Sequence, residues 1–148
     1  MLKFLLLTAF VIAFVVGSAL SLRPSPRQRQ LARLRERAVA LGLRVQWVPG
    51  GTEVDYLLPW ELGDVSQARS LRFAASRVPD GGWELETGVG PPAPGVASAM
   101  AGLPAFLVRT RAVAEGLQIR WNEAGTVDDV DRIALGLRAL AQALLRGG

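Results

Sequence analysis

An uncharged apolar stretch near the start of the chain most strongly constrains what this sequence can form. Nineteen consecutive residues without a charge, Phe4 to Leu22, precede an arginine-rich segment. A helix rises about 1.5 Å per residue, so this stretch covers roughly 28 Å, which is close to the hydrocarbon thickness of a bilayer. The sequence therefore predicts a transmembrane helix over residues 1–22 that anchors a single-pass protein.

The charges that flank this stretch predict an orientation. The segment from Arg23 to Arg37 holds six arginines against one acid, Glu36, whereas only Lys3 precedes the stretch. Positive flanks tend to stay in the cytoplasm, so we expect a bacterial inner-membrane protein with a cytoplasmic C-terminal domain. The alternative is a cleaved signal peptide, because Lys3 forms a small basic region and Gly17-Ser18-Ala19 offers small residues for cleavage.

The positive charge of the chain belongs to this flank. The whole sequence has a formal net charge of +4, but residues 38–148 contain ten arginines against twelve acids. A nucleic-acid-binding domain usually carries a basic surface of its own. The distribution therefore predicts no nucleic-acid partner.

The composition removes several kinds of chemistry. The chain has no cysteine and no histidine, which excludes disulfides, thiolate metal sites, cysteine nucleophiles and histidine general bases. We expect no catalytic residue, no cofactor and no metal site. A carboxylate-dependent enzyme is the least favoured alternative, and its candidate residues are Glu61 with Asp64 or the group Asp128, Asp129 and Asp131.

A basic amphipathic helix is predicted over residues 23–42. Ser25 followed by Pro26 is typical of a helix start, and Gly42 can end the helix. Near an anionic leaflet each arginine gains on the order of 1 kcal/mol, so we expect membrane lipid to contact the helix. The alternative is a solvated basic linker. The expected lipid-contacting residues are Arg27, Arg29, Arg33 and Arg37.

Residues 43–148 have the pattern of an α+β domain. Alternating apolar and polar residues predict strands near 43–47, 54–58, 71–76, 83–87, 106–114 and 117–121, joined in part by glycine-rich turns. Thr126 is typical of the residue that caps a closing helix, and Asp128 and Asp129 suit its positive end. The expected fold is a mostly antiparallel sheet of about six strands with a C-terminal helix packed on it.

The tryptophans divide into two groups. Trp47, Trp83 and Trp121 occupy apolar strand positions, so we expect them to fill the core. Trp60 follows Pro59 and lies off the alternating register. It is the aromatic residue predicted to contact a partner.

The first 45 residues resemble the YajC accessory subunit of the bacterial preprotein translocase. The likeness rests on the uncharged span, on Leu22-Arg23-Pro24, and on the basic, glutamine-bearing Pro26-Arg27-Gln28-Arg29-Gln30. The resemblance implies an inner-membrane subunit that accompanies a larger complex. It supplies no catalytic or ligand-binding residue.

The expected function is a non-catalytic accessory or scaffold subunit of a bacterial inner-membrane complex that is translocase-associated. Its partners would be membrane lipid and another membrane protein, and no small-molecule substrate is identified. The main alternative is an anchored envelope domain that binds a periplasmic ligand.

Overall fold

The structure is a computed structural model that describes residues 1–21, 24–68, 70–86 and 91–147, including the side chains of residues 1 and 3–17 in the first helix. The described residues form two compact units, Met1–Ala32 and Arg33–Gly148. Leu22 and Arg23, which carry part of the translocase resemblance and the predicted boundary between anchor and basic helix, lie outside the described residues.

The first unit contains α1, a helix over Leu2–Ser21. No helix among the described residues is both long and apolar enough to cross a membrane. The prediction of a transmembrane, single-pass anchor over residues 1–22 is therefore wrong, and with it the first element of the predicted fold class.

The basic helix begins and ends as its sequence suggested. In α2, Pro26–Ala40, the backbone N–H of Gln28 donates to Ser25 Oγ, and the backbone N–H of Ser25 donates to Gln28 Oε1. This reciprocal capping satisfies two donors that a helix start leaves open. Gly42 adopts φ = +81°, a conformation that suits glycine after a helix. Leu34 and Ala38 on α2 are buried in the core of the second unit.

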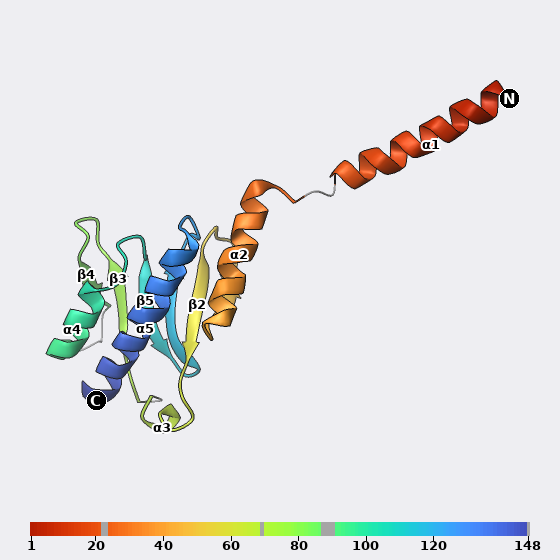
Figure 1. Cartoon of the computed structure of the whole chain (residues 1–148). Coiled ribbons are helices and arrows are strands. Elements are labelled where there is room, and N and C mark those ends of the chain that lie inside the picture. Colours follow the sequence, from red (N-terminus) through yellow and green to blue (C-terminus); the bar gives the residue numbers. More distant parts are fainter. Residues whose placement is uncertain (22–23, 69, 87–90, 148) are drawn as a thin grey trace. The chain divides into compact units, whose positions relative to one another are not determined.

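In the described part of the chain, six antiparallel strands form one sheet, in agreement with the predicted sheet of about six strands. Its strand order is β1-β2-β6-β5-β3-β4, and Figure 1 shows α5 lying across these strands. The predicted positions agree with the observed strands to within a few residues. The strands are β1 (Arg44–Trp47), β2 (Val54–Pro59), β3 (Ala74–Arg77), β4 (Trp83–Leu85), β5 (Arg109–Val113) and β6 (Gly116–Trp121).

Among the described helices, three contribute most of the helical side chains in the core on one face of the sheet, which we call the inner face. They are α2, α4 (Pro94–Ala101) and α5 (Val127–Gly147), while the short α3 (Val65–Ala68) adds Ala68. The predicted closing helix is α5, whose start is capped because Asp129 Oδ2 accepts from the backbone N–H and the hydroxyl of Thr126. These contacts lower the pKa of Asp129.

Gly116 allows β2 and β6 to approach closely. A Cβ atom on this residue would lie 2.2 Å from the carbonyl oxygen of Leu58 and 2.8 Å from its carbonyl carbon. Any other amino acid would therefore push the two strands apart. Glycine at this position fixes where β6 begins to pair with β2, at Pro59.

Candidate interaction surface on the outer face of the sheet

The face of the sheet opposite the core, which we call the outer face, carries two rows of side chains. Strand register places the members of each row side by side across all six strands. Since side chains alternate along a strand, these residues point away from the core that Tyr56, Ile119 and Trp121 help to form. The first row is Gln46, Asp55, Arg120, Arg109, Ser76 and Glu84; the second is Arg44, Leu57, Gln118, Arg111, Ala74 and, just after β4, Glu86.

Two arginines on the outer face form bidentate ion pairs. Arg120 donates from Nε and Nη2 to the two carboxylate oxygens of Asp55, at 2.8 and 2.9 Å. Arg109 donates to Glu86 at 2.5 and 2.6 Å, and Glu86 Oε1 also accepts from Ser76 Oγ. Paired donors held in a plane fix the orientation of both side chains. These contacts raise the pKa of Arg120 and lower the pKa of Glu86.

The ion pairs compensate for repulsion between two neighbouring arginines. Arg109 and Arg120 lie directly opposite each other on β5 and β6, where like charges destabilise a sheet. Asp55 on β2 neutralises one arginine from one side, and Glu86 after β4 neutralises the other from the opposite side. The two positive charges are thus held together between two negative charges. The result is a preorganised polar surface.

Amide groups extend this surface to the end of the sheet. Arg111 donates from Nε to Gln118 Oε1 at 2.6 Å, and Gln118 donates from Nε2 to Gln46 Oε1 at 2.9 Å. Arg111, Gln118 and Gln46 therefore form a hydrogen-bonded chain from β5 through β6 to the strand at the edge. Gln118 is buried even though it lies on the outer face.

A buried carboxylate joins α2 to the sheet. Glu123, in the loop after β6, accepts from Arg35 on α2 and from the hydroxyl of Tyr56 on β2. Burial, followed by the charge of Glu123, raises the pKa of Tyr56, and the contact with Glu123 raises the pKa of Arg35. Glu123 has φ = +52°, which is uncommon for a residue with a side chain. Its three hydrogen bonds, two from Arg35 and one from Tyr56, join α2 to the sheet.

Trp47 is exposed, contrary to the prediction that it fills the core. Its relative exposure is 69%, and the guanidinium carbon of Arg35 lies 4.1 Å from the centre of its ring. The alternation of β1 was interpreted correctly, but alternation does not reveal that β1 is an edge strand. Trp47 is a surface aromatic residue that the sequence did not single out.

Trp60 is buried, whereas the sequence suggested a surface position. It is 9% exposed, its backbone N–H donates to the carbonyl of Glu115, and its indole N–H donates to the carbonyl of Val113. These bonds hold Trp60 over the turn between β5 and β6. A partner contact by Trp60 stays a prediction without a supporting observation.

The arginines predicted to contact lipid have different surroundings. Arg27, Arg29 and Arg33 are exposed. Arg37 donates from Nε to Asp131 on α5 at 2.8 Å, which raises the pKa of Arg37. Arg37 therefore contributes to the packing of α2 in the second unit, and it remains partly exposed.

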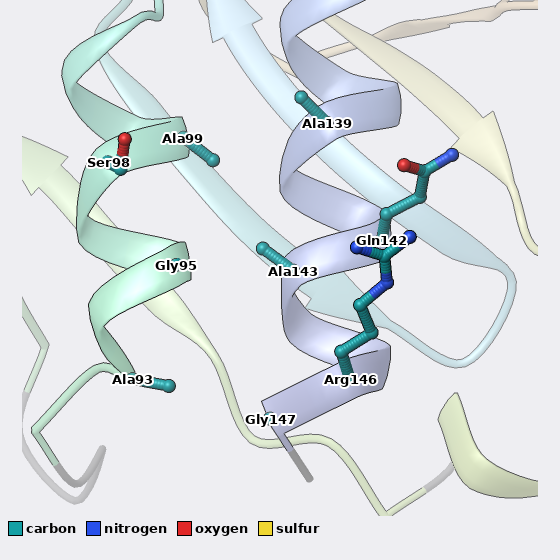
Figure 2. Close-up of a pocket in the computed structure, with 9 residues that line it drawn as sticks. All are labelled: Ala93, Gly95, Ser98, Ala99, Ala139, Gln142, Ala143, Arg146 and Gly147. Atoms are coloured by element: carbon teal, nitrogen blue, oxygen red, sulfur yellow. The ribbon is translucent and has the colours of Figure 1, made fainter.

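A groove between α4 and α5 is lined mainly by small side chains. It has a volume of about 490 Å³, and Figure 2 shows Arg146 and Gln142 rising beside it from α5. Gly95 on α4 faces Ala143 on α5, so the small residues also account for the close approach of the two helices. The lining residues are Ala93, Gly95, Ser98, Ala99, Ala139, Gln142, Ala143, Arg146 and Gly147.

The two groups of carboxylates proposed for an enzyme lie in different places. Glu61 and Asp64 line a small cavity of about 140 Å³ together with Trp60 and Arg138, and the backbone N–H of Asp64 donates to the carbonyl of Glu61 in a turn. Asp129 and Asp131 have helix-capping and ion-pair roles. Within the described ranges, no group of three or more acidic side chains is placed to hold a metal ion.

The fixed ion pairs and amides of the outer face are groups that can bind a partner. The sequence predicted only part of this arrangement. The apolar–polar alternation along β1 and β6 makes Gln46, Gln118 and Arg120 polar strand positions, but nothing local to them indicates which strands lie side by side. Arg35 and Glu123 were missed because 88 positions separate them. No protein-family model, curated protein or solved structure matches the chain.

Proposed function

We propose that the protein is a non-catalytic accessory or scaffold subunit of a larger assembly at the bacterial inner membrane, with its folded domain in the cytoplasm. The main support for this proposal is that the apolar helix α1 belongs to a different compact unit from the folded domain. Apolar side chains of α1 such as Phe4, Leu5 and Phe10 are each more than two thirds exposed. Exposed apolar surface on this scale indicates an interaction site.

The assembly role follows from a difference between the two units: the first exposes apolar side chains, and the second has a core of its own. Burying the apolar side chains of α1 against a partner would be favourable by about 25 cal/mol for each Å² removed from water. The second unit has a core of its own and so does not need the first unit to bury its apolar residues. A subunit of this kind brings a folded domain close to its partner and raises its effective concentration there.

The exposed arginines support a location beside anionic lipid. Arg27, Arg29 and Arg33 are exposed, and each basic side chain near an anionic surface gains on the order of 1 kcal/mol. The full chain should therefore bind vesicles of phosphatidylcholine and phosphatidylglycerol more tightly as the anionic fraction rises. The triple variant Arg27→Gln, Arg29→Gln and Arg33→Gln should lose most of this dependence. The control Arg72→Gln with Arg146→Gln should keep it, and equal behaviour of the two variants would exclude a lipid role for α2.

Crosslinking from α1 tests the assembly role directly. A photoreactive residue at position 10 of the full chain, irradiated in native membranes, should give a discrete adduct with one protein. The same residue at Leu62, which is 98% exposed in the second unit, is the matched control. The additional substitution Leu7→Glu should reduce the position-10 adduct at least several-fold. The proposal fails if position 10 gives the same adducts as position 62.

A reporter fused after Gly148 tests the location of the domain. Activity of an enzyme that works only in the cytoplasm is the expected result. Activity of a reporter that works only in the periplasm would contradict the cytoplasmic location.

A further inference from the structure

The strand at one end of the sheet has an open side. β1 pairs with β2, and no other described strand pairs with it. An edge strand presents alternate backbone N–H and C=O groups that a further strand can bind. The backbone of β1 therefore offers a directional binding site.

The hydrogen-bonded chain of the outer face ends at this edge with an unused donor. Gln46 Oε1 accepts from Gln118 Nε2, which leaves the Nε2 amino group of Gln46 for a further partner. Within the described part of the chain, this amino group donates to nothing. A half-buried amide gains from a second bond if a matching acceptor is brought to the edge.

Apolar side chains border the same edge on the inner face. Trp47 is exposed although Arg35 covers one side of its ring, and Val39, one turn beyond Arg35 on α2, is also exposed. Val45, two residues before Trp47 on β1, points to the same face and is half-buried. A strand added to β1 would cover these side chains while it completes the backbone hydrogen bonds.

We propose that β1 pairs antiparallel with β1 of a second copy of this chain, about a twofold axis that passes beside Gln46. In this register, Gln46 lies opposite Gln46 of the second copy, and Val45 lies opposite Trp47. A twofold axis perpendicular to the sheet keeps outer-face residues on the outer face, so both polar rows continue across the interface.

A second copy fits this edge because the strand is complementary to itself. Among the described residues of a single copy, Gln46 Nε2 has no acceptor. In the dimer, the Nε2 group of each Gln46 can donate to the Oε1 atom of the other. An aromatic side chain opposite a β-branched one is a favourable cross-strand pair. Arg44 lies opposite Val48, so no arginine faces another arginine. This interface is independent of the proposed role of α1.

A single introduced cysteine tests the register, because the natural chain has none. Directly opposite residues of antiparallel strands have Cα atoms about 4.5–5.5 Å apart, within the range that a disulfide spans. Under mild oxidation, the full-length Gln46→Cys variant should form a disulfide-linked dimer in high yield. Leu62→Cys, fully exposed, and Glu84→Cys, on the opposite edge strand β4, are the matched controls. Their yields should be at least several-fold lower.

A second measurement separates this interface from association through α1. Sedimentation of the full chain in a mild detergent should give a dimer mass for the natural sequence. Trp47→Lys should reduce the dimer fraction several-fold, both in sedimentation and in the disulfide yield of Gln46→Cys. Equal disulfide yields at positions 46, 62 and 84 would mean that only α1 or random collision joins the copies, which would overturn the proposal. A disulfide from position 46 to a different protein, or a natural chain that stays monomeric, would also overturn it.

Discussion

The inner face of the sheet carries Tyr56, Ile119 and Trp121 beneath helices, whereas the outer face carries Asp55, Gln118 and Arg120 on the same two strands. The inner face is stabilised by removing apolar surface from water, which needs little directional precision. The outer face depends on geometry, since each charged or amide group must meet its partner at hydrogen-bond distance. One sheet thus combines two different faces. The apolar face tolerates small changes in side-chain orientation and provides stability, and the polar face has fixed hydrogen-bond geometry that suits recognition.

Two tryptophans give the largest contrast that this comparison predicts. Trp121→Ala should lower the free energy of unfolding by about 3–5 kcal/mol, because it removes a fully buried ring and leaves a cavity. Trp47→Ala, measured on dilute monomeric protein, should cost less than about 1 kcal/mol, because most of the ring contacts water in a single copy. Urea unfolding of the full-length variants, followed by circular dichroism, measures both values. Similar losses in the two variants would mean that Trp47 also contributes to the core.

A double-mutant cycle on Asp55 and Arg120 should show the strongest coupling on the outer face. The side chain of Asp55 is 8% exposed, so Asp55→Ala leaves Arg120 without its acceptors and should cost about 2 kcal/mol. The double variant with Arg120→Met should lose less than the two single variants together, by about 1 kcal/mol or more. The same cycle on Glu86 and Arg109, which are more exposed, should give a smaller coupling. Additive losses at both pairs would contradict the preorganised surface.

The dependence of stability on pH below neutrality should show the contribution of Glu86. Its pKa is lowered from 4.5 by the hydrogen bonds from Arg109, so the folded state binds this proton less readily than the unfolded state. The resulting stability is fully present above about pH 4.5 and is lost as the pH falls through the folded-state pKa. Glu86→Gln should flatten this part of the profile by less than about 1 kcal/mol. Thermal unfolding from pH 7 down to pH 3 measures the slope, and an unchanged slope would exclude Glu86 as a contributor.

Arg111 should give the smallest effect. Its guanidinium donates to the neutral amide of Gln118, so Arg111→Gln keeps a donor at this position and should change stability by less than about 0.5 kcal/mol. The same urea titration used for the tryptophans measures it. A loss comparable to that of Asp55→Ala would show that the amide chain stabilises the sheet as strongly as the ion pairs do.

The strands and their order along the chain could be predicted because alternation is a local property. Leu117, Ile119 and Trp121 alternate with Gln118 and Arg120, and this pattern places one face of β6 in the core whatever its neighbours are. The caps at Ser25 and Thr126 were equally predictable, since a helix start is satisfied by residues within three positions of it.

The candidate surface could be predicted only in part because it depends on long-range pairing. Nothing near Gln46 indicates that Gln118 will lie two strands away, and nothing near Arg35 indicates that Glu123 will accept from it. The exposure of Trp47 and the burial of Trp60 were misjudged for the same reason. One depends on β1 being at the edge, and the other on the turn that reaches Trp60 through Val113.

The lack of a side chain at Gly116 affects the register of two strands and therefore the outer face of the sheet. Because the backbone of Leu58 occupies the space that a side chain at 116 would need, β2 and β6 can align in only this way at their shared end. A shift of β6 by one position would turn Arg120 toward the apolar helices and expose Ile119 and Trp121. The absence of a side chain at one strand end thus helps to keep the charged groups of the two strands on the same face.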